Sequence, residues 1–192
     1  MVTSVFPQQL KNVIIVDIPL NSSKASAIEK LKQKGFELKE RSEKGEQKEL
    51  MYVRGGGFYS ADAMVTLTEK DKMITKISWG CSNIEPIQLE LEEEMDLSPF
   101  YIIIGEHAET RFYHWKGKTI ELVKTDPTFL AITRQTAGEM MGALGAYGLV
   151  SDQEMNHISD LLKFPHGVTF LSNEDAEKRI QEHQQRLERE EQ

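Results

Sequence analysis

The stretch NSSKASAIEKLKQKG, residues 21–35, decides the fold because a helix with clear ends is followed at once by strand patterns. Its first three residues, Asn-Ser-Ser, are good N-cap residues, since a short side-chain oxygen can accept a hydrogen bond from a free amide of the first turn. Apolar residues recur every third position, and lysine and glutamate occupy the other side. Gly35 can end the helix because glycine adopts the left-handed conformation without strain. We therefore predict one amphipathic helix over residues 24–34.

Beyond Gly35 the apolar period changes to two, which is typical of half-buried strands. A polar turn around Gly45 joins the first two predicted strands, and three glycines at residues 55–57 precede the third. Residues 59–67 and 73–79 form a further predicted antiparallel pair around a charged turn. The predicted fold class is α+β, with an N-terminal helix packed on an antiparallel β-meander and a helical C-terminal segment.

The chain from residue 101 onward is predicted to continue as strands and then helices. Tyr101 to Ile104 reads as a buried strand, and residues 111–123 as a second hairpin. We divide the chain into a sheet domain, residues 1–125, and a helical segment, residues 126–192, which either packs on the sheet as part of one domain or forms a separate one. The elements predicted in that segment are helices over 127–132 and 136–147, a helix beginning at the capping box Ser151/Glu154, a short apolar segment over 168–171, and a last helix capped by Ser172 or Asn173.

An acidic stretch between Ile77 and Thr110 carries the whole net charge of the protein. The stretch holds 8 acidic residues and no lysine or arginine, so the rest of the chain holds 31 − 8 = 23 acidic and 23 basic residues. The alternation of apolar and polar residues over 87–91 favours a strand, although Pro86 and the abundant glutamate also fit a helix. We predict a strand there. The acidic residues are Glu85, Glu90, Glu92, Glu93, Glu94, Asp96, Glu106 and Glu109.

The composition excludes several classes of protein. Hydrophobic residues make up 39% and charged residues 28%, as in soluble globular proteins. A single cysteine, Cys81, cannot form an intramolecular disulfide or a thiolate zinc cluster. Apolar runs such as residues 13–16 are far below the roughly 20 residues that span a bilayer. A sequence pI near 5.2 gives no support for direct nucleic-acid binding. We expect a cytoplasmic protein with no cofactor and no membrane partner.

One cluster of side chains could carry metal or acid–base chemistry. His107, Glu109 and His114 are the candidate catalytic residues, and His107 and His114 are the candidate metal ligands. On an extended strand His107 and Glu109 share a face, while His114 lies on the other, so the three converge only if the chain reverses near Thr110. The alternative is that all three are exposed hairpin residues without a chemical role.

The leading hypothesis for function is a non-enzymatic protein-interaction module of the inhibitor, immunity or adaptor type. It presents an acidic face to a basic protein partner, since charge of one sign speeds encounter and rejects wrong partners. Two alternatives are a small-molecule or metal-dependent enzyme, and an inhibitor that mimics nucleic acid. A homo-oligomer is compatible with the sequence. The predicted binding residues are Glu90, Glu92, Glu93, Glu94, Arg111, Tyr113 and Trp115.

Overall fold

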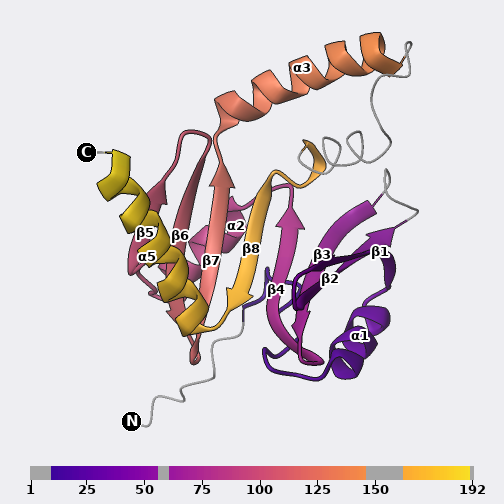
Figure 1. The fold of residues 1–192 in the computed structure, drawn as a ribbon, viewed down its shortest axis with the longest axis vertical. Coiled ribbons are helices and arrows are strands. Elements are labelled where there is room, and N and C mark those ends of the chain that lie inside the picture. Colours follow the sequence, from indigo (N-terminus) through magenta and orange to yellow (C-terminus); the bar gives the residue numbers. More distant parts are fainter. Residues whose placement is uncertain (1–9, 56–60, 146–161, 191–192) are drawn as a thin grey trace.

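The structure, a computed structural model, describes residues 10–55, 61–145 and 162–190. They form an α+β fold with an N-terminal helix, an antiparallel sheet of eight strands and a C-terminal helix, as the sequence predicts (Figure 1). The elements are α1 (Lys24–Gln33), β1 (Phe36–Lys44), β2 (Gln47–Gly55), β3 (Ala61–Lys70), β4 (Met73–Cys81), α2 (Glu85–Leu89), the π-helical turn η2 (Glu90–Glu94), β5 (Tyr101–Ile104), β6 (Ala108–Trp115), β7 (Lys118–Thr125), α3 (Pro127–Gly145), β8 (His166–Leu171) and α5 (Asn173–Glu190).

The sheet consists of two meanders joined by the last strand of the chain. Its order is β1-β2-β3-β4-β8-β7-β6-β5, and every neighbouring pair is antiparallel. β8 lies between β4 and β7 (Figure 1). Phe170 of β8 pairs with Ile77 on one side and with Ile120 on the other. The short apolar segment predicted near residue 168 is therefore a central strand.

Helix α1 begins and ends where the sequence predicts. Ser23 is its N-cap, and the Oγ atom of Ser23 accepts a hydrogen bond from the amide of Ser26 at 3.3 Å. Gly35 follows the helix with a φ of 80°, the left-handed conformation that glycine adopts without strain. Ala27 and Leu31 are fully buried and lie four residues apart, so one face of α1 packs against the sheet.

One face of the sheet carries the main hydrophobic core. Ile77, Tyr113 and Phe170 are fully buried there beneath α1, α2 and the segment over residues 10–20. Burying each such side chain stabilises the fold by roughly 1.5–3 kcal/mol. Because Ile77 belongs to β4 and Tyr113 to β6, the two meanders share a single core.

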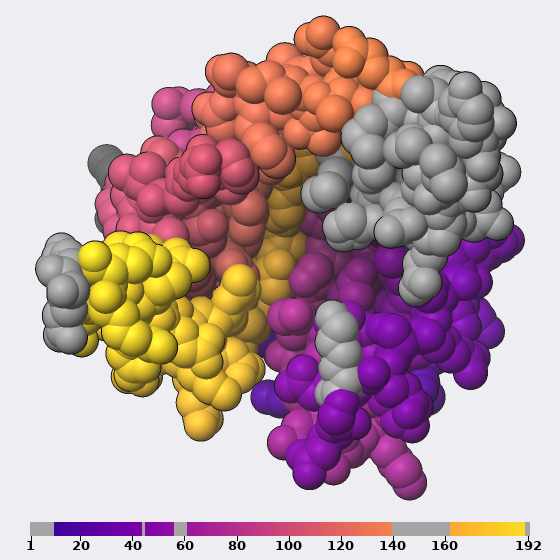
Figure 2. All heavy atoms as spheres, turned by 45° about the horizontal axis from the view of Figure 1, so that its top comes forward, coloured from indigo at the N-terminus to yellow at the C-terminus, as the bar shows by residue number. Residues whose placement is uncertain are grey.

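Helix α5 covers the other face of the sheet over the second meander. Phe112, Leu171 and Ala176 are buried together between α5 and the strands. Ser172 caps the helix as predicted, since its Oγ atom accepts the amide of Asp175 at 3.0 Å. Figure 2 shows the surface hollowed between α5 and the half formed by β1 to β3, with β8 and β4 at the base.

The predicted strand over residues 87–91 is wrong, because α2 and η2 form a continuous helical stretch there. Pro86 lies in the first turn, where an amide would have no partner in the helix. Ile87 and Leu91 are buried four residues apart, whereas Leu89 between them is 52% exposed. The buried positions therefore follow the helical period.

Two further predictions need correction. Strand β5 exists as predicted but is not a buried strand, because it is an edge strand of the described sheet and Ile104 is 81% exposed. Helix α3 is continuous over residues 127–145, where two helices were predicted, and the Asp126 side chain accepts the amide of Phe129 in its first turn at 2.9 Å. The helix predicted to begin at Ser151 lies outside the described residues.

Candidate functional site

Arg111 of β6 connects the glutamate-rich turn η2 to the sheet. Its Nη1 atom donates to Oε1 of Glu92 at 2.7 Å, and its Nε atom donates to Oε1 of Glu109 on the same strand. The hydroxyl of Tyr113 donates to the same Glu92 oxygen at 2.5 Å. We call Glu92, Glu109, Arg111 and Tyr113 the Arg111 cluster. It lies between η2 and β6 and brings together three of the predicted binding residues.

The groups of the Arg111 cluster stabilise each other's ionisation states. Burial acts to raise the pKa of Glu92, but the hydrogen bonds from Tyr113, Arg111 and Gln88 outweigh burial and lower that pKa. Burial, together with the neighbouring Glu92 carboxylate, raises the pKa of Tyr113, so the hydroxyl remains a donor. The cluster holds two carboxylates and one guanidinium, which leaves a net charge of −1 by subtraction.

Glu90 is buried and has a structural role, so it is not part of a partner-binding surface. The residue is 1% exposed, and its Oε2 atom accepts the amide of Asn12 at 2.9 Å. Its other oxygen accepts the amide of Lys11. The carboxylate therefore fastens the segment that precedes α1 to η2, and the prediction that Glu90 faces a partner is corrected.

Tyr113 and Trp115 are also absent from the surface. Tyr113 is fully buried, and Trp115 is 8% exposed. The prediction that Tyr113 and Trp115 bind a partner assumes that one face of this strand is open to solvent. Both faces of β6 are covered, because Tyr113 and Trp115 pack in the main core and Phe112 packs under α5.

Glu93 and Glu94 remain at the surface of η2. Glu93 is exposed, and Glu94 forms an ion pair with Lys11 at 3.5 Å with its side chain 60% exposed. Such a surface pair adds little to stability. The acidic stretch is thus divided between one buried anchor, one cluster around Arg111 and a set of exposed carboxylates.

Strand β5 has an open outer edge among the described residues, because it ends the sheet. The amide of Gly105 donates to the carbonyl of Ala108 at 2.9 Å, so this is a hydrogen-bonded pair of the β5–β6 ladder. Hydrogen-bonded pairs alternate along a ladder, so the backbone groups of Ile102 and Ile104 point outward. Both side chains are exposed as well, at 44% and 81%.

The two edges of the sheet differ in chemistry. β1 carries Lys39, Glu40 and Arg41 and has an irregular register near residue 40, features that discourage pairing with another chain. β5 reads Tyr-Ile-Ile-Ile and has no charge. Sequence reasoning missed this open edge, although the absence of charge in residues 101–104 was a usable signal.

The three candidate catalytic residues do not converge. The His107 ring stacks on Phe129 with centroids 4.1 Å apart, and the His114 ring stacks on Phe100 at 3.9 Å. Glu109 pairs with Arg111. His114 lies five residues further along β6 than Glu109, which is about 16 Å on an extended strand. In the ranges that the structure describes, no group of three potential ligands could hold a metal ion.

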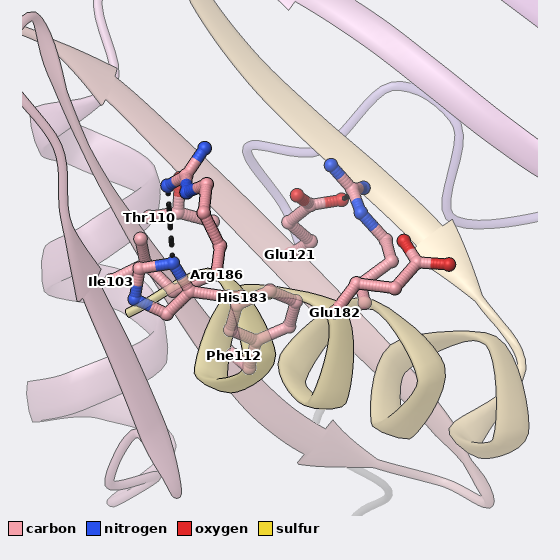
Figure 3. Close-up of a pocket in the computed structure, with 8 residues that line it drawn as sticks. Ile103, Thr110, Phe112, Glu121, Glu182, His183 and Arg186 are labelled. Carbon is pink, nitrogen blue, oxygen red and sulfur yellow. Dashed lines mark hydrogen bonds and ion pairs between the residues drawn. The ribbon is translucent and has the colours of Figure 1, made fainter. Parts of the chain in front are cut away.

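A groove of about 340 Å³ lies between α5 and the strands beneath it (Figure 3). Glu121 is 2% exposed and accepts a hydrogen bond from Arg179 of α5. Burial raises the pKa of Glu121, and the positive charge of Arg179 partly offsets that effect. Figure 3 shows His183 and Arg186 together beside Ile103, with Glu121 set apart from them. The groove therefore does not pair this histidine with the buried carboxylate.

No known protein family, curated protein or solved structure matches the chain. Among the described helices, none is both long and apolar enough to cross a membrane. A proposal for function therefore depends on the chemistry of the site.

Proposed function

We propose that the protein is an interaction module that binds a basic, extended segment of a partner protein along the edge of β5. The observation that carries the proposal is the uncharged edge of Ile102 and Ile104, which no described strand pairs with, beside an excess of carboxylates. An extended peptide can add to such an edge as a further strand, where backbone hydrogen bonds give affinity and alternate side chains give specificity.

The exposed isoleucines give this edge an apolar centre. Ile102 pairs with Arg111 and Ile104 pairs with Glu109, so both isoleucines lie next to the Arg111 cluster. Interfaces commonly combine an apolar centre with a polar rim. A partner strand would bury the isoleucine side chains and satisfy the outward amides and carbonyls in the same step.

Negative charge around the edge sets the expected chemistry of the partner. The Arg111 cluster retains a charge of −1, and the turn after β5 adds Glu106, whose side chain is 87% exposed. Glu93 on η2 adds a further exposed carboxylate. Lysine or arginine at alternate positions of a partner strand would complement these groups and speed association.

A displayed library of random linear peptides provides the direct test. We expect the selected peptides to combine β-branched residues with lysine or arginine, and their binding to weaken as salt is added. Ile102→Pro should abolish binding, because it removes an outward amide without removing a hydrogen bond of the sheet. Ile102→Thr keeps that amide and should retain part of the affinity.

Two charge variants serve as a matched pair. Glu106→Lys should weaken binding, whereas Glu43→Lys, on β1 and 69% exposed, should leave it unchanged. Peptides without a basic bias, or equal binding to the Ile102→Pro variant, would overturn the proposal. Concentration-dependent dimerisation that Ile102→Pro abolishes would assign the edge to a second copy of this chain instead.

A further inference from the structure

A cavity of about 630 Å³ is lined by the β6–β7 turn and by Ser172, which precedes α5. Figure 1 shows this turn and the start of α5 at the same end of the sheet. One wall is the turn itself, from Trp115 to Lys118, and Ser172 lies at the rim of the helix. The opposite wall is the segment over residues 16–21, with Lys30 of α1. The volume falls in the range of cavities that hold small organic molecules.

The turn places two ammonium groups on one aromatic ring. Lys116 and Gly117 both have positive φ, of 48° and 75°, as a tight two-residue hairpin requires. The Nζ atoms of Lys116 and Lys118 consequently lie 4.9 Å and 4.7 Å from the centroid of the Trp115 ring. The Nζ atom of Lys118 also lies 3.9 Å from the Phe170 centroid.

These positive charges lack a carboxylate partner in the described part of the chain. No ion pair joins Lys116 or Lys118 to an acidic residue there. Among the described lining residues Asp17 is the only acidic one, and its carboxylate pairs with Lys34 at 3.1 Å. Lys30 donates to the backbone carbonyl of Asp17. A lining with three lysines and one aspartate is unusual in a chain with a net charge of −8.

We propose that this cavity binds a small organic anion, with a carboxylate or phosphate between the ammonium groups of Lys116 and Lys118. The indole of Trp115 and the side chains of Pro19 and Leu20 supply apolar surface for the remainder of the ligand. An anion between two ammonium groups removes their mutual repulsion and forms charge-assisted hydrogen bonds. This site is independent of the β5 edge.

The ionisation of Lys118 supports the assignment. Burial, and to a smaller extent the charge of Lys116, lowers the pKa of Lys118 to about 8. A bound anion favours the charged form and raises that pKa. By linkage, the anion binds tightly below the free pKa and loses affinity as the pH rises above it.

Trp115 fluorescence offers a direct measurement, because the chain contains two tryptophans and Trp79→Phe leaves Trp115 alone. Inorganic phosphate and benzoate are the two probes. At neutral pH we expect a saturable emission change with at least one of them. Saturation by phosphate alone would indicate that the ligand of the cavity carries a phosphate group. Saturation by benzoate alone would indicate an aromatic carboxylate as the ligand.

Lysine variants test the named groups. Lys118→Gln should weaken binding about tenfold or more, as loss of a charge-assisted contact does. Lys163→Gln is the control, because that lysine also lies near a ring, 5.9 Å from the Phe164 centroid, but outside the cavity. Carbon-13 NMR of reductively methylated protein should show the Lys118 pKa rising when the probe is added.

The proposal fails if neither probe saturates at millimolar concentration, or if Lys118→Gln binds as well as the parent protein. It also fails if the NMR titration of Lys118 is unchanged by a saturating probe. Thermal unfolding of each variant establishes that the comparison is made on folded protein.

Discussion

Glu90 and Asn12 lie 78 residues apart in the sequence, yet the Glu90 carboxylate accepts the Asn12 amide at 2.9 Å. The same carboxylate accepts the amide of Lys11, so a single buried side chain satisfies two consecutive backbone donors. A buried carboxylate is costly unless it is hydrogen-bonded, and these donors supply that compensation. The contact fixes the segment that precedes α1 against η2.

Removing this anchor should destabilise the protein. Glu90→Ala leaves two backbone amides without their acceptor, and we expect a loss of about 2–4 kcal/mol in the free energy of unfolding, measured in urea. Glu90→Gln keeps one acceptor and should lose less. Glu93→Ala, at the exposed surface of the same turn, should change stability by less than about 0.5 kcal/mol. Equal effects at the two positions would contradict the anchoring role.

Arg111 should determine how the protein responds to acid. The folded state lowers the pKa of Glu92 from its ordinary value of 4.5, so this stabilisation is complete above that value and disappears as the pH falls through the folded pKa. We expect Arg111→Met to cost about 1–3 kcal/mol at neutral pH. The difference in free energy of unfolding between Arg111→Met and the parent protein should become smaller below pH 4.5.

Unfolding curves measured across this pH range would check the expected convergence. Arg54→Met is the control, since Arg54 pairs with Asp62, whose side chain is 61% exposed. That variant should show a small difference at every pH. A pH-independent deficit for Arg111→Met would mean that lost packing, rather than charge, explains its effect.

Cys81 should be unreactive in the folded protein. It is 5% exposed, and burial raises the pKa of its thiol to about 12, so little thiolate forms near neutral pH. We expect an aromatic disulfide reagent to modify it only after denaturant is added. Rapid labelling in native buffer would show that the thiol is accessible.

Replacing glycine by alanine should destabilise the fold at Gly80 and stabilise it at Gly138. A Cβ atom on Gly80 would lie 2.9 Å from Cβ of Phe164 and 3.1 Å from Cε of Met64. Gly80→Ala should therefore cost about 1–3 kcal/mol through overpacking. At Gly138 in α3 a Cβ meets no described atom within 4 Å, and Gly138→Ala should stabilise the fold by roughly 0.5–1 kcal/mol. Thermal unfolding of both variants measures the contrast.

Local sequence signals predicted the elements whose ends are determined by neighbouring residues. The Ser23 cap and Gly35 define α1 because both act within one turn of the chain. Residues 87–91 fit both a strand and a helix, and the prediction gave too little weight to Pro86 at the first turn. Burial of Ile87 and Leu91 selects the helix, and that burial depends on distant strands.

Long-range pairing could not be read from local patterns. The place of β8 between β4 and β7 depends on partners 85–95 residues away in β4 and 44–52 residues away in β7, so residues 166–171 gave only an apolar signal. The same reason explains the candidate site. Nothing near Glu90 in the sequence indicates that Asn12 is its partner, and nothing near Lys118 indicates that Lys30 lies across the same cavity.

The position of β8 has a consequence for synthesis of the protein. β4 and β7 are complete by residue 125, but the strand that joins them ends at Leu171. During translation the edges of β4 and β7 that pair with β8 therefore stay unpaired until residues 166–171 have left the ribosome. A chain that ends before residue 166 should therefore expose the edges of β4 and β7 and aggregate unless a chaperone binds it, rather than form a smaller folded protein.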